Sequence, residues 1–571
     1  MKSLYSEHPM KEVGMNAVYG ADRLGRVIPS GEGEGRRDRL VGIFYFLWLE
    51  QNGTDGPWDV SRVLAEDPTA ATDMNHPAWG SLNGTMHHWG EPLYGYYFTR
   101  DEWVIRRHIE LLAFADVDFL VFDTTNRVIY FENATKIMGI IAEYAKAGYR
   151  VPKVAFYTNT DSGSTVNELY DRIYSQNLYP ESWFLLDGKP LVIDKPDECR
   201  AEVRDFFTHR VSQWPFDPVH PGGFPWMEFI RPQRVYRDAD GQPEIMNVSV
   251  AQHPNCAHSD SAFYGEYGAW GRSWHNGGKD IRENAWEYGF NFAEQWEYAL
   301  KIDPKMVFVT GWNEWIAGRW TFDRTSPSTT VLTNEEDTST YTRAAIPEKR
   351  GVMCDCCSLE YSRDIEPMKG GYSDNYYMQL VEYIRRYKGG EPDPCDDGEG
   401  LFYRDFPFGN LPRDCRGYGT AVYREKGSAN DILTMTVRRQ GEDFVFSAAA
   451  REAIKPEGNW MRLYIVPTGQ KQYGSVLAPW RTETYILTPD GAVTKYLNKQ
   501  KTIVGRAEVA VRGAMIFYTV SREALGLGPG AVSFDFKWAD GVEDDGTAED
   551  FYLHGNCAPA GRLCYRYTSA E

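Results

Sequence analysis

The sequence predicts an α/β chain in which a (β/α)8 TIM barrel is followed by an all-β antiparallel sandwich. Three observations support this prediction. Short apolar segments alternate with amphipathic helical segments up to about residue 390. The composition then changes to the Gly/Pro/acidic stretch GGEPDPCDDGEG. Beyond this stretch, short segments with alternating apolar and polar residues follow one another at the spacing of a sandwich.

Apolar β-type segments define the expected barrel strands, at 41–48, 118–125, 153–159, 190–194, 225–230, 247–253 and 306–312. Helical patterns are expected from about residue 99, and at 131–147, 164–175, 198–208, 284–301 and 373–388. These are seven strands, so a closed barrel requires one more. A doubly wound open sheet is the alternative, but no Gly-rich phosphate loop follows any of the strands.

The same changes in pattern give the expected domain boundaries. Residues 1–38 are polar and form an N-terminal arm, and residues 39–390 form the barrel, with an insertion at 319–362 near its active-site end. Residues 391–400 are a linker, and residues 401–571 form the β-sandwich.

The charge of the chain limits its general partners. It has 61 Lys and Arg against 81 Asp and Glu, a net charge of −20, so nucleic acid, anionic membranes and polyanionic glycans are not expected as general partners. A local basic pocket remains compatible with this balance. Aromatic residues make up 14% of the chain, including 18 Trp and 36 Tyr. This abundance suggests a surface that binds an oligo- or polysaccharide, and the oligomeric state is left open.

The expected cellular location and the expected absence of a cofactor both rest on features that are missing from the sequence. No segment reaches the roughly 20 apolar residues of a membrane span. The first residues contain no apolar core of a secretory signal, which indicates a cytoplasmic protein unless a leader has been removed. Cys354, Cys356 and Cys357 could suggest a metal site, but matching ligands at a recognisable spacing are missing, so neither a metal nor another cofactor is expected.

The segment KMVFVTGWNEWIAGR (305–319) is the best candidate for an active-site element. The apolar run 306–309 predicts a buried parallel strand, which ends at Trp312, Asn313, Glu314 and Trp315. Active sites of TIM barrels lie at the carboxyl ends of the strands. Indole rings suit the apolar faces of sugars, and Glu314 suits glycosidic-bond chemistry as a base or nucleophile.

Other polar and aromatic residues are expected at the same end of the barrel. Candidates for substrate binding at strand ends or in the loops that follow are Trp48, Glu91, Asn126, Tyr157, Asp194, His253, Trp274 and His275, together with Trp312, Asn313 and Trp315. Each of these could instead be a core polar group or a helix cap.

Glycoside hydrolysis normally requires a second carboxyl group. Glu366, in SRDIEPMKGG (362–371), precedes the last barrel helix and is favoured as the acid, and Asp123 is a further catalytic candidate. Asp364, Glu91 and Glu228 compete for the same role.

The YFLW-type first strand, the strand ending in GWNEW and the Glu-Pro dipeptide at 366–367 together resemble glycoside hydrolase family 99 and the related WbsX-like proteins. This resemblance implies a (β/α)8 enzyme acting on α-mannosides with retention of configuration. The family motif is close to WNEWxEG, and both of its glutamates are catalytic. Glu314 matches the first glutamate, but the second falls on Ala317, which cannot transfer a proton. An acid could then come from Glu366 or from the insertion, through Glu335, Glu336 or Asp337.

The C-terminal part resembles sandwiches of carbohydrate-binding-module family 9, which implies sugar binding; a purely structural accessory is the alternative. For the whole protein, a glycosidase is the leading hypothesis. A polysaccharide lyase would use a base such as His253, Tyr157 or Tyr264. A non-catalytic glycan-binding protein is the third possibility.

Overall fold

The computed structural model describes residues 10–31, 35–73, 76–80, 86–253, 269–324, 326–343, 346–353, 358–390, 392–468, 483–497, 500–543 and 548–570. The candidate base Tyr264 and the cysteines Cys354, Cys356 and Cys357 lie outside these residues. None of the helices within these ranges is long and apolar enough to cross a membrane.

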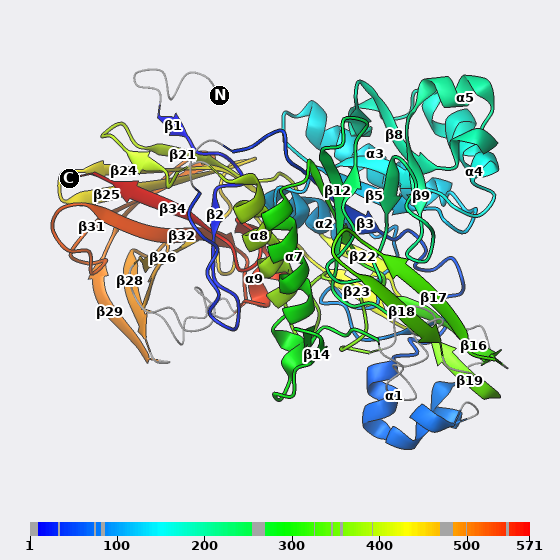
Figure 1. The fold of residues 1–571 in the computed structure, drawn as a ribbon. Coiled ribbons are helices and arrows are strands. Elements are labelled where there is room, and N and C mark those ends of the chain that lie inside the picture. The colour runs from blue at the N-terminus through cyan, green and yellow to red at the C-terminus, as the bar shows by residue number, and fades with distance from the viewer. Residues whose placement is uncertain are drawn as a thin grey trace.

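Eight parallel strands form a nearly closed, barrel-like sheet (Figure 1). Around the sheet they follow the order β10 (Gly223–Pro225), β9 (Thr208–Gln213), β8 (Lys189–Asp194), β6 (Lys153–Tyr157), β5 (Phe119–Asp123), β3 (Leu40–Tyr45), β15 (Met306–Thr310) and β12 (Pro243–Ser249). Strands β10 and β12 meet at the two ends of this order, where Asn247 Nδ2 of β12 donates to Trp226 O at 3.0 Å. The sheet is therefore TIM-barrel-like.

The interior of this sheet is filled by large apolar side chains. Phe44, Val121, Ile193, Phe224 and Phe308 belong to one buried cluster inside the strands. Strands buried on both faces need such continuous apolar runs, which explains why most of them could be located in the sequence.

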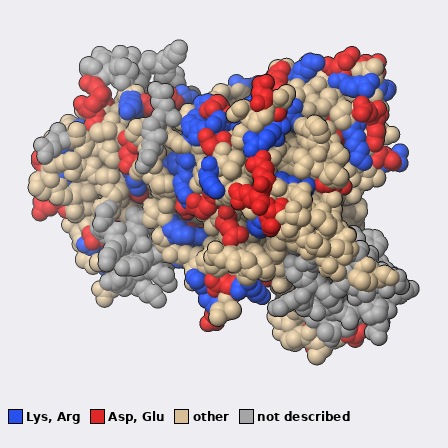
Figure 2. Space-filling view, viewed as in Figure 1, with Lys and Arg blue, Asp and Glu red and all other residues tan. Residues whose placement is uncertain are grey.

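Helices connect most of the strands: α2 (Glu102–Phe114), α3 (Phe131–Lys146), α4 (Ser162–Leu169), α5 (Ala201–Phe206) and α7 (Phe290–Ile302), with α8 (Asn375–Lys388) after β15. Helix α2 begins two residues later than a cap at Thr99 would require, because the N-cap is Asp101, whose side chain accepts from Trp103 N. Acidic and basic side chains are interspersed over α7 and α8 (Figure 2), for example in the Arg386–Glu297 ion pair.

The fifth and sixth strands differ from the sequence prediction. Strand β9, with the sequence THRVSQ, was missed because it is short and mostly polar. The strand expected at 225–230 is wrong in position, because β10 ends at Pro225, where that prediction began. Residues 214–222, all of which are described, contain no helix between β9 and β10. Strands and helices therefore do not alternate in this part of the barrel.

The insertion forms four strands, β16 (Ile316–Arg324), β17 (Ser328–Thr333), β18 (Thr338–Arg343) and β19 (Ile346–Met353). Strand β16 pairs with β19 and with β4 (Met86–His88). The turn between β17 and β18 contacts other parts of the barrel: Arg237 pairs with Glu335 at 2.7 Å, and Tyr298 of α7 donates to Glu336 at 3.0 Å.

The C-terminal part contains two mainly antiparallel sheets. The first has the order β1 (Lys11–Glu12), β21 (Leu401–Arg404), β24 (Ile432–Gln440), β25 (Asp443–Ala450), β31 (Met515–Ser521) and β30 (Glu508–Arg512). The second has the order β2 (Val18–Tyr19), β34 (Cys564–Ser569), β32 (Val532–Asp540), β26 (Arg462–Pro467), β27 (Thr484–Leu487), β28 (Ala492–Leu497) and β29 (Gln500–Arg506). Rings of Phe444 and Phe446 on β25 contact Phe534 on β32, so the two sheets share a core. Strands β1 and β2 come from the first 38 residues.

Candidate active site

Two segments meet at the carboxyl end of β15. Gly311 N donates to Arg363 O at 3.0 Å, and Glu366 N donates to Trp312 O at 3.0 Å. Residues 363–366 therefore run beside residues 311–314. This backbone pairing brings Arg363 and Asp364 to Glu314, although they are about fifty residues away in the sequence.

The Glu314 carboxylate forms a buried ion pair with Arg363. Arg363 Nε and Nη2 both donate to Glu314 Oε2, at 3.2 and 2.5 Å. The two side chains are only 3% and 2% exposed, so solvent screens this pair weakly. The guanidinium also lies over the Trp226 ring, 5.1 Å from its centre. This arrangement favours the ionised form of Glu314.

Asp364 is a second buried carboxyl group beside Glu314. Its Oδ1 accepts from Glu314 N at 2.7 Å, whereas Oδ2 has no hydrogen-bond partner among the described residues. Burial raises the pKa of Asp364 to about 6, although the Glu314 N–H and the charges of Arg363 and Arg272 act to lower it. Asp364 can therefore carry a proton near neutral pH, next to a carboxylate that is held by a cation.

Glu366 is fully buried and has three donors. Tyr97 OH and Trp315 Nε1 donate to Oε2 at 2.7 and 2.5 Å, and His108 Nε2 lies 3.0 Å from Oε1. Each carboxylate oxygen is thus occupied by a protein group. These contacts suit an anchor for Trp315 better than a proton donor to a substrate.

The three other residues of the GWNEW motif are also in the core. Trp315 stacks on Trp89 with ring centres 4.4 Å apart, and Trp312 packs edge-on against His108. Both Trp312 and Trp315 are fully buried. Asn313 accepts from Phe46 N and donates to Phe46 O, at 2.8 and 3.1 Å. Asn313 therefore fixes the backbone next to Glu314.

The candidates at other strand ends make mostly internal contacts. Asp194 bonds His209 Nδ1 at 2.9 Å and accepts from Cys199 Sγ, and the Tyr157 hydroxyl donates to Phe224 O at 2.8 Å. Asp123 is buried and accepts from Thr125 N. None of these contacts reaches Glu314.

The loop candidates are spread around the barrel. Asn126 is exposed, and Trp48 is half-buried against Phe46. Trp274 stacks near Trp270, with ring centres 5.9 Å apart, and His275 bonds Asp280 at 2.9 Å.

The remaining candidates pair with neighbouring side chains. Glu91 pairs with Lys369 at 3.3 Å, and His253 packs edge-on against Phe229. Glu228 is buried and bonds Arg234 and Tyr236, which removes it as a competitor for the acid role.

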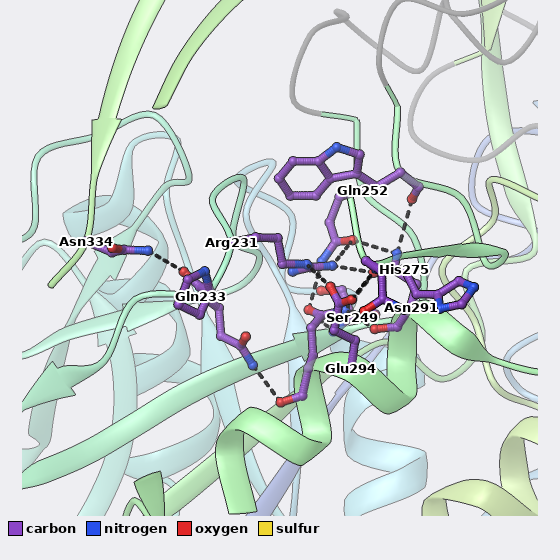
Figure 3. A network of polar contacts seen from close by, with 12 residues as sticks. Arg231, Gln233, Ser249, Gln252, His275, Asn291, Glu294 and Asn334 are labelled. Atoms are coloured by element: carbon purple, nitrogen blue, oxygen red, sulfur yellow. Dashed lines mark hydrogen bonds and ion pairs between the residues drawn. The ribbon is translucent and has the colours of Figure 1, made fainter. Parts of the chain in front are cut away.

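A polar network that the sequence did not reveal lies beyond the end of β12 (Figure 3). Arg231 Nη2 donates to Gln252 Oε1 at 3.1 Å and to Asn291 Oδ1, and Asn291 Nδ2 donates to Gln252 Oε1 at 2.8 Å. The Arg231 guanidinium lies over Trp270. The network joins the segment after β12 to α7. Arg231 directly follows one predicted strand and Gln252 lies near the end of another, but a single Arg or Gln at such a position gives little indication of a network.

No group of three or more His, Cys, Asp or Glu side chains suited to a metal ion occurs within the described ranges.

The solved structures that are similar to this chain include two of the same enzyme. Both are of the GH99 endo-α-mannosidase from Bacteroides thetaiotaomicron, one of them in complex with BIS-TRIS-propane. They are 16% and 15% identical to this chain, cover 62% of it and 98% and 100% of their own chains, and have TM-scores of 0.34 and 0.33. At these scores nothing about activity is inferred from the likeness. No family model and no curated protein matches the chain.

Proposed function

We propose that the protein hydrolyses glycosidic bonds of an oligo- or polysaccharide, with Glu314 as the base or nucleophile. The observation that carries this proposal is the pair of neighbouring carboxyl groups, Glu314 and Asp364, in opposite electrostatic situations. Arg363 holds Glu314 as a carboxylate, and burial keeps a proton on Asp364 up to about pH 6. A carboxylate paired with a cation, beside a carboxyl group that can keep its proton, is the combination that acid–base cleavage of a glycoside needs.

In this proposal Asp364 is the general acid. Its proton moves from the carboxyl group to the glycosidic oxygen as the bond from that oxygen to the anomeric carbon breaks. Glu314 either attacks the anomeric carbon or takes a proton from the attacking water. The expectation that Glu366 is the acid stays a prediction, but its three donors support a positioning role through Trp315.

Aromatic side chains at the same end of the barrel support a sugar as substrate. Trp226 lies over Arg363, and Trp214 packs edge-on against Trp226 with ring centres 5.3 Å apart. Trp48 and Trp214 are half-buried, and they follow β3 and β9. Indole rings combine an apolar face with an N–H donor, a combination suited to sugar rings.

A lyase has less support. The hydroxyl of Tyr157 is engaged by backbone groups, since it donates to Phe224 O and accepts from Gln213 N at 3.1 Å. Burial also raises the pKa of Tyr157, which opposes its use as a base. A glycan-binding protein without activity remains the second candidate, favoured by Ala317 at the position of the second family glutamate.

The test is hydrolysis of a panel of nitrophenyl glycosides and oligosaccharides by the wild-type protein and by Glu314→Gln. The control is Glu132→Gln, which changes an exposed glutamate on α3. Release of nitrophenol or new reducing ends by the wild type and by the control, but not by Glu314→Gln, supports the proposal. An unsaturated product that absorbs in the ultraviolet would indicate a lyase, and binding without any product would indicate the non-catalytic protein.

We also propose that the C-terminal part binds sugar. A pocket of about 500 Å³ is lined by Gly458, Asn459, Trp460, Arg462, Thr488, Pro489 and Asp490. Trp460 is half-buried and offers a ring face, and the amide, guanidinium and carboxylate groups around it can bond sugar hydroxyls.

A further inference from the structure

A second cavity lies where the barrel meets the C-terminal part, and neither the proposed active site nor the Trp460 pocket uses it. Its volume is about 630 Å³, within the range of small-ligand sites. On the barrel side the lining comes from the loop after β3, the first turn of α2 and Lys136 of α3. On the other side it comes from Pro412 and β22 (Arg413–Arg416). The ligand space therefore exists only when both parts of the chain are together.

The walls of this cavity are held rigidly. Arg413 Nε donates to Asp101 Oδ2 at 2.8 Å, and both side chains are almost fully buried. The same guanidinium lies over the rings of Trp103 and Tyr423, at 4.8 and 4.0 Å. Cys415 Sγ donates to Asp101 Oδ2 at 2.9 Å. These contacts fix β22 against the start of α2, so the cavity is formed before any ligand arrives.

The acidic side chains of the lining already have partners. Glu50 is bonded by Thr99 N at 2.7 Å and by Asn133 Nδ2 at 3.1 Å. Asp101 is held by Arg413, as above. The remaining two acids, Glu102 and Asp414, pair with Arg106 at 2.8 Å and Arg424 at 3.6 Å, neither of which lines the cavity.

Three cations of the lining retain unused donors. Arg100 uses only Nε, in a 3.3 Å contact with Glu50, and its side chain is 56% exposed. The Nζ of Lys136 lies 3.8 Å from Glu102, too far for a strong hydrogen bond. Arg416 is exposed, and its side chain has no hydrogen bond or ion pair with any residue that the structure describes. The lining carries four acidic and four basic side chains, and three of the basic ones still have N–H donors that no described residue uses fully.

We propose that this cavity binds an acidic sugar residue, with the carboxylate of the sugar on Arg100, Lys136 and Arg416 and the ring against Phe98. Arginine guanidinium groups bind carboxylates through two parallel hydrogen bonds. Phe98 is half-buried and lines the same space, and an aromatic face suits the C–H face of a sugar. The proposed site does not require hydrolysis at Glu314. Sugar binding to this cavity can be measured in the absence of turnover.

The experiment is calorimetric titration of the full chain with tetragalacturonate and with its fully methyl-esterified form. The variant is Arg100→Gln/Arg416→Gln, and the control is Arg386→Gln on α8, which pairs with Glu297 at the surface; neither of these two residues lines the cavity. We expect the wild type and the control to bind the charged tetramer, and the double variant to bind it about tenfold or more weakly, because hydrogen bonds to charged groups are lost. Binding should also weaken as salt is added.

Three results would overturn the proposal: no binding of tetragalacturonate by the wild type, equal binding of the methyl ester, or equal binding by the double variant. Because the assay also works with Glu314→Gln protein, failure at this cavity is distinguishable from failure of the proposed hydrolase activity.

Discussion

Arg363 donates from both Nε and Nη2 to a single oxygen of Glu314, at 3.2 and 2.5 Å, in a site from which solvent is almost excluded. Two charges buried in this way depend on each other, because either one alone would remain in a medium that solvates it poorly. Glu314 therefore owes both its ionisation and its orientation to a residue that follows it by 49 positions.

The first prediction concerns this ion pair. Arg363→Met should lower the free energy of unfolding by about 3–5 kcal/mol, since it leaves Glu314 buried without its cation. Turnover should fall as well, because Glu314 loses its orientation. Arg386→Met is the control, since its ion pair with Glu297 is at the surface and such pairs contribute about 0–1 kcal/mol. Urea unfolding of both variants measures the difference, and equal losses would contradict the role given to Arg363.

The second prediction separates Asp364 from Glu366. If Asp364 is the acid, kcat/KM of the wild type should fall as the pH rises through about 6, because the carboxyl group must be protonated to donate. Asp364→Asn should lose this limb of the pH profile. It should also lose about 10²–10⁴-fold activity on natural substrates and much less on substrates with good leaving groups.

Glu366→Gln is the comparison for Asp364→Asn. It should lower the activity on both kinds of substrate by the same factor, because it changes the support of Trp315 and not the proton transfer. If Glu366→Gln is instead the variant rescued by good leaving groups, the acid is Glu366.

The sequence was sufficient to predict those strands and helices that are specified by residues close together in the chain. Strand β15 (Met306–Thr310) is an apolar run followed by polar residues, so both its burial and its end shortly before Glu314 could be inferred. Four of the six residues of strand β9 are only half-buried, and its mostly polar sequence does not show the apolar run by which buried strands are recognised. The sixth barrel strand was misplaced because the loop after β10 carries the apolar residues Trp226, Met227 and Phe229, all of which are buried.

The candidate site depended on contacts between distant segments, which no local pattern encodes. Trp312 and Trp315 flank Glu314 in the sequence and were expected to face a sugar, but both pack into the core. By sequence Glu366 was favoured as the acid and Asp364 was one of its competitors. The tertiary contacts are what support Asp364 instead, because Glu366 meets three donors and Asp364 Oδ2 meets none among the described residues.

The third prediction concerns the C-terminal pocket. Trp460→Ala should weaken retention of the protein on immobilised polysaccharide by about tenfold, equivalent to 1.4 kcal/mol, without changing hydrolysis of a small nitrophenyl glycoside. Affinity electrophoresis in gels that contain the polysaccharide measures this effect. The control is Lys455→Ala, which removes only a surface ion pair with Glu452. A second tryptophan such as Trp183 is unsuitable as a control, because its indole N–H donates to Leu178 O. Unchanged retention of Trp460→Ala would leave the pocket without a sugar-binding role.

The fourth prediction concerns a buried acid between the barrel and the second sheet of the C-terminal part. Burial raises the pKa of Glu110 on α2 to about 8, although Arg107 and Lys537 act to lower it. The same environment lowers the pKa of the Lys537 ammonium group, again through burial. Because Glu110 has a higher pKa in the folded chain than the ordinary value of about 4.3, folding takes up a proton between these two pH values.

The sign of the effect on stability follows from this uptake. The contribution of Glu110 to the free energy of unfolding is fully present below about pH 4.3 and is lost as the pH rises through about 8, with a slope of at most about 1.4 kcal/mol per pH unit.

Glu110→Gln cannot take up the proton, so its free energy of unfolding should depend less on pH between 5 and 8 than that of the wild type. Urea unfolding across this range measures the difference, with Glu132→Gln as the control on a surface helix. Asp364 and Asp405 also have raised pKa values and contribute the same sign to both proteins, so only the difference between the curves reports on Glu110. Parallel curves would mean that Glu110 is already ionised in the folded protein.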